Sequence, residues 1–323
     1  MSDAQHFEKN SAQSPRKPDF LIIGAPRSGT TYIAKNLENH PSIAIAASKD
    51  DPFANDLHFF DVNTPKGMEN YSRGIDWYFQ QFQHFPKNVL VGEKTADYLV
   101  DIDSPELIKR HLPAVKLIAI LRDPVERAQS HFWHSRHRLP AGLSLSDLVQ
   151  REQDTNNVWV LESGFYSKQL NRYFQYFDKK QTLILFHEDI QNSPNKTLQA
   201  ICEFLGVEAD NIEFKDAFSR INSGSSSIAS QFIARVGTVL RKASPRLYSA
   251  MLNGPLSKVT KLILQTLRGK KVRSTSHQTP DNTYPKLDTA TRRKLFELYK
   301  SDIEQLSEMV DRDLMSLWNK PGS

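Results

Sequence analysis

The sequence predicts an α/β fold in which a central parallel sheet lies between layers of helices. Short apolar runs alternate along the chain with segments whose apolar residues have helical spacing. The runs are continuously apolar, as expected of strands that are buried on both faces. A glycine-bounded loop, Gly24 to Gly29, separates the first run from the first helical segment. Strands that alternate with helices in this way are typical of parallel sheets.

Each expected strand is a short apolar run, and the strands span 20–23, 42–47, 89–91, 116–121 and 182–186. The expected helices each carry an apolar side, and they span 30–37, 74–85, a segment starting at 104, then 123–138, 143–151, 164–177, 193–206 and 288–318. Ser104 is expected to cap its helix, with Pro105 as the first helical residue. Asp123 is expected to cap the next helix, in a capping box that Glu126 completes.

The chain has 323 residues, of which 39% are hydrophobic, and this is enough for one large α/β domain. Residues 1–18 are polar and are expected to form a disordered tail before a single domain, 19–323. Within it, 228–271 combines apolar and basic residues and predicts a basic amphipathic helical insertion, and 288–318 predicts a C-terminal helix. The insertion is interpreted as a hairpin packed on the sheet domain, or alternatively as a face for a membrane surface or an acidic substrate.

Composition narrows the possible partners and the compartment. The net charge of +5 favours an anionic ligand, and the sequence lacks the dense basic runs with interleaved aromatics that nucleic-acid binding favours. The sequence has no run of 18 apolar residues for a membrane span, and no secretory signal. A single cysteine, Cys202, suits a reducing compartment, so we expect a cytoplasmic protein. The His and Cys residues lack zinc-ligand spacing, and no metal is expected.

The loop from Gly24 to Gly29 has the layout of a phosphate-binding loop, in which backbone N–H groups and a helix N-terminus face an anion. Its spacing equals that of the nucleotide-triphosphatase pattern, with Thr31 at the hydroxyl position. Thr30, however, stands where that pattern has the lysine that reaches the β- and γ-phosphates. A triphosphate with magnesium therefore fits poorly, whereas Arg27 can face a smaller anion. An ordinary glycine-containing turn is the alternative interpretation.

A second candidate site follows the strand 116–121. Arg122 ends this strand, and Ser130 lies about two helical turns after Asp123. Ligands of parallel sheets bind beyond the carboxyl ends of the strands, so Arg122 and Ser130 are expected at the same edge as the loop and within reach of one anion. A salt bridge at the strand end is the alternative role of Arg122.

Two stretches, LIIGAPRSGTT and LIAILRDPVERAQSHFWH, resemble the 5′-phosphosulfate loop and the 3′-phosphate motif R-x-P-x-x-R-x-x-S of PAPS-dependent sulfotransferases. DLHFFD, GIDWYFQQF and GEKTADYL are similar to segments of the heparan-sulfate-type branch, and GFYSKQLNRYFQYF and YPKLDTATRRKLFELY resemble bacterial members. The resemblance implies a three-layer P-loop-type fold with a C-terminal helical region. It also implies sulfuryl transfer from 3′-phosphoadenosine 5′-phosphosulfate (PAPS) as co-substrate, without a metal.

The resemblance carries roles onto matching residues. Those that would hold the 5′-phosphate and the sulfuryl oxygens are Arg27, Ser28, Gly29, Thr30 and Thr31. Arg122 and Ser130 would hold the 3′-phosphate, with further contacts from the basic loop 268–273. Lys94 would face the transferring sulfuryl group, and Tyr166 matches an aromatic residue near the cofactor.

The catalytic base departs from the family pattern. The family's glutamate falls on Asp56, and His58 is a rival two residues further on. A histidine's unperturbed pKa of about 6.5 suits proton abstraction better than the value of about 3.9 of an aspartate, but position favours Asp56. Glu93 is a third candidate, for which pairing with a nearby cation is the more expected role.

The acceptor is expected to be a hydroxyl or an amine of a small molecule or glycan. The heparan-sulfate-type branch indicates a carbohydrate, whereas the insertion 228–271 would instead bring the enzyme to a lipid-linked small molecule or to a membrane surface. Two other classes remain as alternatives: a P-loop kinase or NTPase, against which Thr30 argues, and a non-enzymatic module that binds anions or a membrane surface.

Overall fold

A computed structural model describes residues 15–48, 56–150, 159–209 and 287–319. The insertion predicted at 228–271 and the basic loop 268–273 lie outside these residues, as do residues 1–14 of the predicted tail. The last residues of that tail contact the sheet, since Arg16 Nη2 donates to Val89 O at 2.6 Å and pairs with Asp19 at 3.1 Å. The single domain 19–323 stays a prediction.

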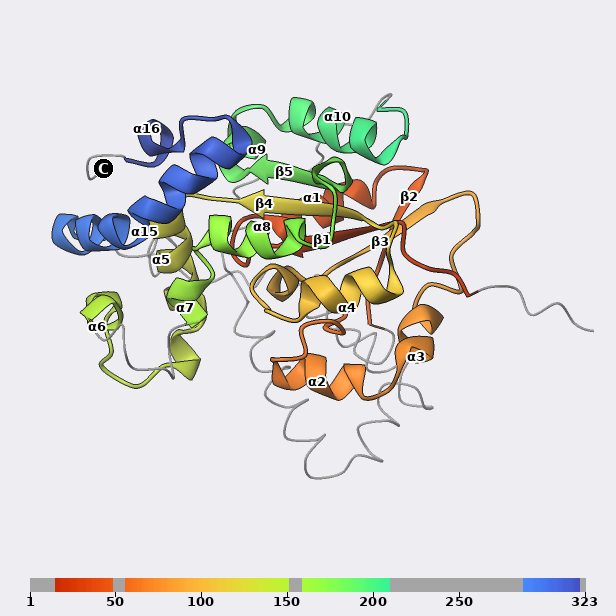
Figure 1. Ribbon diagram of the computed structural model, residues 1–323, viewed down its shortest axis with the longest axis horizontal. Coiled ribbons are helices and arrows are strands. Elements are labelled where there is room, and N and C mark those ends of the chain that lie inside the picture. The colour runs from red at the N-terminus through yellow and green to blue at the C-terminus, as the bar shows by residue number, and fades with distance from the viewer. Residues whose placement is uncertain (1–14, 49–55, 151–158, 210–286, 320–323) are drawn as a thin grey trace, which may run out of the picture. The chain divides into compact units, whose positions relative to one another are not determined.

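The core of the fold is a five-stranded sheet in the order β2-β3-β1-β4-β5 (Figure 1). All four pairs of neighbouring strands run parallel. The strands are β1 (Phe20–Gly24), β2 (Ile43–Ala46), β3 (Leu90–Lys94), β4 (Lys116–Leu121) and β5 (Thr182–Phe186). The predicted parallel sheet is confirmed, and the largest difference of strand length is at β3, which continues through Glu93 and Lys94. Charged residues extend this strand because their side chains find polar partners inside the protein.

Side chains of β1 alternate between two hydrophobic clusters, as the pleat of a strand requires. Phe20 and Ile22 point into the smaller cluster, whereas Leu21 and Ile23 point into the larger one. The helices of the smaller cluster are α1 (Thr30–Leu37), α9 (His187–Asn192) and α10 (Pro194–Leu205). Figure 1 shows α10 on one side of the sheet and α4 and α8 on the other, so helices cover both faces.

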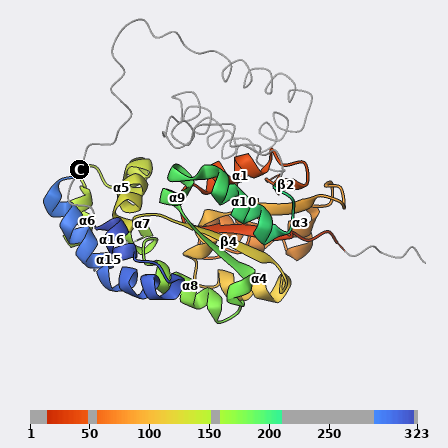
Figure 2. The same cartoon turned by 90° about the horizontal axis from the view of Figure 1, so that it is seen from above.

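The larger cluster receives residues from more elements, and Figure 2 shows the same layers from above. Its helices are α2 (Pro65–Tyr71), α3 (Ile75–Gln80), α4 (Ser104–His111), α5 (Pro124–His134), α6 (Leu145–Gln150), α7 (Trp159–Glu162), α8 (Tyr166–Phe174), α15 (Thr289–Val310) and α16 (Leu314–Trp318). Short 3₁₀ turns are η1 (Ala96–Leu99), η2 (Arg136–Arg138) and η3 (Lys179–Gln181). The η1 turn lies so close to β1 that a Cβ atom at Gly24 would be 2.5 Å from Leu99 Cβ.

At the N-terminus of α5, the predicted cap by Asp123 is confirmed, but the predicted role of Glu126 in a capping box is wrong. The Asp123 carboxylate accepts the N–H groups of Val125 and Glu126 at 2.9 and 3.3 Å, as predicted. Glu126 does not complete a capping box: the Asp123 N–H donates to Glu188 Oε1 at 3.1 Å, and Glu126 pairs with Arg122 at 3.1 Å. Glu126 forms an ion pair with Arg122, and Glu188 of α9 accepts the N–H group that Glu126 was expected to accept.

Other helix boundaries also differ from the prediction, as α3 ends at Gln80 where a helix over 74–85 was expected. Ser104 is the first residue of α4, after Asp103 at the cap position, because its hydroxyl donates to Phe60 O at 2.8 Å instead. The final helix is divided into α15 and α16 by Asp311, whose φ of 51° is left-handed and ends α15. Among the described residues, no helix is both long and apolar enough to cross a membrane.

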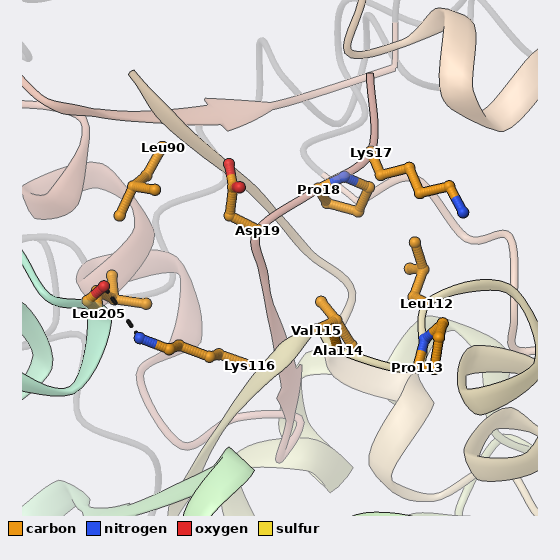
Figure 3. Close-up of a pocket in the computed structure, with 10 residues that line it drawn as sticks. All are labelled: Lys17, Pro18, Asp19, Leu90, Leu112, Pro113, Ala114, Val115, Lys116 and Leu205. Carbon is orange, nitrogen blue, oxygen red and sulfur yellow. Dashed lines mark hydrogen bonds between the residues drawn. The ribbon is translucent and has the colours of Figure 1, made fainter. Parts of the chain in front are cut away.

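A cavity of about 430 Å³ lies at the amino ends of β1 and β4, where Asp19 and Lys116 line it together with Leu112 and Leu205 (Figure 3). Lys116 Nζ donates to Phe204 O at 2.7 Å from the wall of this cavity. The predicted site residues follow the carboxyl ends of the strands, and none of them lines this cavity.

Candidate active site

The loop after β1 turns back on itself before α1. Arg27 and Gly29 both adopt left-handed φ values, 69° and 102°, and the Ser28 N–H donates to Ala25 O at 3.2 Å. Gly29 occupies the cap position of α1 without a side-chain cap from the described residues. The first N–H groups of α1 therefore meet the loop at a helix N-terminus, which favours a negatively charged ligand.

The second predicted motif lies at the same edge and contacts this loop. Arg27 Nε donates to Ser130 Oγ of α5 at 3.2 Å, and Arg122 Nη1 donates to Arg27 O at 3.4 Å. Ser130 was expected to act with Arg122, but its described partner is Arg27. The two motifs thus form one cationic region, in which Ser28, Thr30 and Ser130 are buried.

Buried side chains hold the backbone of this region from behind. The Tyr166 hydroxyl, on the fully buried first residue of α8, donates to Arg122 O at 2.9 Å. His187 Nδ1, directly after β5, lies 2.9 Å from Ser28 O. Tyr166 was predicted near the cofactor, and its described contact is with the backbone of Arg122. No site role was predicted for His187, although its position directly after a predicted strand at this edge could have indicated one.

Lys94 joins the loop to the segment that carries the candidate base. Its ammonium group contacts the Asp56 carboxylate and donates to Thr31 Oγ1 at 3.5 Å. The other Asp56 oxygen accepts the Ala96 N–H at 3.4 Å. The Lys94 side chain is 6% exposed and that of Asp56 is 22% exposed, so the ion pair is largely buried but reachable from solvent. A carboxylate, a cation and the loop hydroxyl of Thr31 therefore meet at one point.

His58 lies beside this ion pair but is already paired. Its Nδ1 atom is 2.7 Å from Asp61 Oδ2, on a fully buried residue, and 3.9 Å from Asp97 Oδ2. Burial lowers the pKa of His58, but the hydrogen bond and charge of Asp61, with the charges of Asp56 and Asp97, outweigh it and raise this pKa to about 9. The imidazole is consequently protonated at neutral pH, which removes the lone pair that a general base needs.

Glu93 is fully buried, and its partners among the described residues are hydroxyl groups and not the cation that was expected. Its Oε2 accepts the Thr95 hydroxyl at 2.8 Å, and its Oε1 accepts the Tyr78 hydroxyl at 3.1 Å. Burial raises the pKa of Glu93 to about 7, although hydrogen bonds from Tyr98, Thr95 and Tyr78 oppose this shift. Both carboxyl oxygens of Glu93 therefore accept hydrogen bonds from hydroxyl groups.

One group of side chains has the ligand types of a metal site. The ligand atoms of His58, Asp61 and Asp97 lie within 4.8 Å of one another. A His–Asp hydrogen bond of 2.7 Å already joins two of them. The expectation that no metal takes part stays a prediction.

Three supporting residues, Glu188, Arg292 and Trp318, lie on helices that contain none of the predicted site residues. Asp123 is fully buried and pairs with Arg292 of α15 at 2.9 Å, and Trp318 Nε1 donates to Glu188 Oε1 at 3.0 Å. Burial raises the pKa of Asp123 to about 6, and the charge of Arg292 opposes this shift. The C-terminal helices therefore support the backbone beside Arg122.

Comparison with known proteins identifies the family of the chain. Residues 17–230 match the family model described as "Sulfotransferase domain". Because this match covers more than half of the chain, the chain belongs to the sulfotransferase domain family. The family match favours this class over a P-loop kinase or a non-enzymatic binding module.

Two curated relatives carry names from heparan sulfate modification. The chain is 34% identical over 204 residues to bifunctional heparan sulfate N-deacetylase/N-sulfotransferase 3 of Mus musculus, covering 59% of this chain and 22% of that protein. It is 27% identical over 203 residues to heparan sulfate glucosamine 3-O-sulfotransferase 3B1 of Mus musculus, covering 62% and 48%. The match thus spans less than half the length of either relative.

A solved structure shares the fold. The crystal structure of a sulfotransferase from Alicyclobacillus acidocaldarius matches with a TM-score of 0.63 and 21% identity, covering 94% of this chain and 100% of that chain. The match extends the likeness of fold to nearly the whole chain.

Proposed function

We propose that this sulfotransferase moves a sulfuryl group from PAPS to a hydroxyl or amine of a carbohydrate by in-line displacement. The observation that carries the proposal is a junction of three segments at one sheet edge. Arg27 joins the loop after β1 to Ser130, and Lys94 joins Thr31 of that loop to Asp56. Groups that bind anions, a cation and a carboxylate base therefore share one site.

The residues at this edge fit a donor that has an anionic group at each end. The N-terminus of α1, with Arg27, Thr30 and Thr31, would hold the 5′-phosphosulfate end. Arg122 and Ser130 would hold the 3′-phosphate, and Arg122 Nε is a buried donor that lacks a hydrogen-bond partner among the described residues. A buried donor without a partner is costly, and a phosphate oxygen would satisfy it.

In the proposed step, the acceptor oxygen or nitrogen forms a bond to sulfur, and the bond from sulfur to the bridging oxygen of the donor breaks. The electron pair of that bond stays on the 5′-phosphate of the bisphosphate product, where Arg27, Lys94 and loop N–H groups stabilise the charge. The acceptor proton moves to the base. Positioning and electrostatics supply most of the acceleration, as in other group transfers of this kind.

Asp56 is the base that we propose, in preference to His58. Its carboxylate contacts Lys94, the cation proposed to face the sulfuryl group. The pKa of His58 is raised to about 9 while its Nδ1 is held by Asp61, so at neutral pH it is a cation beside the site. As an imidazolium, His58 would attract an anionic part of the acceptor.

A carbohydrate acceptor is supported by the relatives' names, one of which specifies N-sulfation and the other 3-O-sulfation. These names leave both an amine and a hydroxyl as acceptor groups. A lipid-linked acceptor at the insertion 228–271 is the alternative, and it concerns residues outside the described part of the chain.

The test incubates the full chain with radiolabelled PAPS and, separately, heparan-type polysaccharide with free amines, the same polysaccharide with acetylated amines, and a lipid extract. Label in a polysaccharide is expected, and comparison of the first two arms identifies the amine or the hydroxyl. In parallel, thermal shifts are measured with the 3′,5′-bisphosphate product and with ATP–magnesium. Stabilisation by ATP–magnesium but not by the bisphosphate would refute the proposed donor, and label only in the lipid arm would refute the carbohydrate.

A further inference from the structure

The segment that follows Asp56 is held by hydroxyl groups through its backbone. The N–H groups of Leu57 and His58 both donate to Thr95 Oγ1, at 3.1 and 3.2 Å. The next N–H, of Phe59, donates to the Tyr98 hydroxyl at 3.1 Å. Three consecutive N–H groups next to the proposed base therefore donate hydrogen bonds to two side-chain hydroxyls.

The Thr95 hydroxyl also bonds to Glu93, donating to its Oε2 atom at 2.8 Å. The side chains of Thr95, Tyr98 and Glu93 are all fully buried. Because the Thr95 hydroxyl has one proton, donating it to the carboxylate leaves the oxygen lone pairs free to accept the backbone N–H groups.

The hydrogen-bond count at Thr95 is complete. Its proton goes to Glu93 and its two lone pairs accept the N–H groups of Leu57 and His58. Two consecutive N–H groups can converge on one oxygen because His58 adopts a left-handed φ of 48°, a conformation that a non-glycine residue keeps only when its surroundings hold it. The network thus fixes the backbone on the carboxyl side of Asp56.

The same strand end also fixes the side chain of Asp56. Glu93 and Thr95 hold the backbone after Asp56, whereas Lys94, between them, contacts its carboxylate. Because the side chains of successive residues in an extended strand point to opposite sides, the segment 93–95 can contact both the side chain of Asp56 and the backbone that follows it.

We propose that Glu93 and Thr95 are positioning residues for catalysis, which place the Asp56 carboxylate through the hydrogen bonds that Thr95 accepts from the N–H groups of Leu57 and His58. This inference rests on the proposed function, in which Asp56 takes the acceptor proton. In this proposal Glu93 contacts neither donor nor acceptor and does not act as the base. Its role is to orient the Thr95 hydroxyl.

The test compares Thr95→Val, which removes the hydroxyl at nearly constant volume, with Thr95→Ser, which keeps it. A displacement of about 1 Å costs on the order of 10²-fold in rate, so kcat of Thr95→Val is expected to fall by about that factor. Thr95→Ser is expected to stay within about threefold of wild type. Affinity for the 3′,5′-bisphosphate, measured by calorimetry, is expected to be unchanged in both variants, because the nucleotide contacts lie elsewhere.

A double-mutant cycle distinguishes positioning from general damage. In the Asp56→Ala background, Thr95→Val should cause no further loss, because the group that it positions is absent. Thr197→Val is the matched control: this buried threonine of α10 donates to Ser193 O at 3.2 Å and its loss should leave kcat unchanged. Wild-type kcat in Thr95→Val, an additive loss in the Asp56→Ala background, or an equal loss in Thr197→Val would overturn the inference.

Two further measurements test the inference if Thr95→Val does not fold or if the chain does not use PAPS. Tyr98→Phe removes the second hydroxyl and should lower kcat in the same non-additive way if Thr95→Val is unstable. Amide hydrogen exchange at Leu57 and His58 needs no substrate, and it should accelerate in Thr95→Val but not in Thr197→Val. Unchanged exchange would overturn the inference, whereas accelerated exchange in a chain without PAPS-dependent transfer would refute only the proposed function.

Discussion

Arg27 Nε donates a hydrogen bond to Ser130 Oγ over 3.2 Å, although 103 positions separate the two residues. The contact joins the loop after β1 to the second turn of α5. Arg122 adds a second link through its hydrogen bond to Arg27 O at 3.4 Å. The groups proposed for the two ends of one nucleotide therefore contact each other.

The first prediction concerns selectivity for the 3′-phosphate. Ser130→Ala should weaken binding of the 3′,5′-bisphosphate by about tenfold or more, since a hydrogen bond to a charged group contributes about 1.5–3 kcal/mol. Binding of 5′-AMP, which lacks the 3′-phosphate, should change much less. Calorimetry with both nucleotides measures the ratio. Ser163→Ala, which removes a hydroxyl that donates to Trp159 O at 2.8 Å on α7, is the control. Equal losses for both nucleotides would contradict the assignment.

The second prediction concerns charge at the leaving group. Arg27→Ala should lower turnover with PAPS by about 10²–10³, by analogy with the removal of one oxyanion donor. Arg110→Ala provides the control, because this arginine forms an exposed pair with Glu106 on α4, away from the sheet edge. Turnover and nucleotide affinity are measured for both variants. Near-normal turnover in Arg27→Ala would remove this residue from the mechanism.

The sheet was predictable because burial on both faces leaves a local signal. Runs such as Phe20–Ile23 and Leu117–Leu121 are continuously apolar, and the structure buries both. The phosphate loop and Arg122 were predictable as neighbours because they follow strand ends of one parallel sheet. In contrast, α9 is short and polar in sequence, HEDIQN, and no apolar period predicts it.

The supporting contacts of the site were not predictable because they join residues far apart in the chain. Local spacing predicted that the Glu126 side chain accepts the Asp123 N–H in a capping box. In the structure Glu188 accepts this N–H, from 65 positions away. Similarly, Glu93 carried no pattern beyond its place before Lys94, and its role depends on the Thr95 hydroxyl, which also accepts the N–H groups of Leu57 and His58. Sequence periodicity records which face is buried, but it does not record the partner of a buried polar group.

The third prediction is a pH dependence of stability. The pKa of His58 is raised from 6.5 to about 9, so its contribution to stability is complete below pH 6.5 and is lost as the pH rises through about 9. Each pKa unit is worth about 1.4 kcal/mol, so wild type should lose at most about 3 kcal/mol of unfolding free energy relative to His58→Asn over this range. Asparagine is the chosen replacement because it tolerates the left-handed backbone. Urea unfolding at pH 6 and pH 9 measures the difference.

His111→Asn is the control for the sign of this effect. Burial, with the charges of Arg110 and Lys17, lowers the pKa of His111, so its titration lies below pH 6.5. The unfolded state binds more protons at this position, so His111 favours folding more as the pH rises, and His111→Asn should not reduce the loss between pH 6 and pH 9. If His58→Asn also keeps that difference, the ion pair of His58 with Asp61 does not form in solution.

The fourth prediction concerns the support of α8 by α15. Asp302 of α15 accepts the N–H groups of Ser167 and Lys168 at 3.0 and 3.1 Å and the Ser167 hydroxyl at 2.5 Å. A side chain from 135 positions away thus satisfies the first turn of α8. The preceding residue, Tyr166, donates to Arg122 O at 2.9 Å, so this cap also supports the proposed 3′-phosphate site.

Asp302→Ala should therefore affect both stability and binding. Loss of a helix cap and of its buried acceptors should lower the unfolding free energy by about 2 kcal/mol. Affinity for the 3′,5′-bisphosphate should also fall, because Tyr166 loses its fixed position against Arg122. Glu304→Ala, at an exposed position of the same helix, should change neither quantity. Chemical unfolding and calorimetry measure them, and a loss of stability with unchanged nucleotide affinity would show that α15 supports α8 without supporting the site.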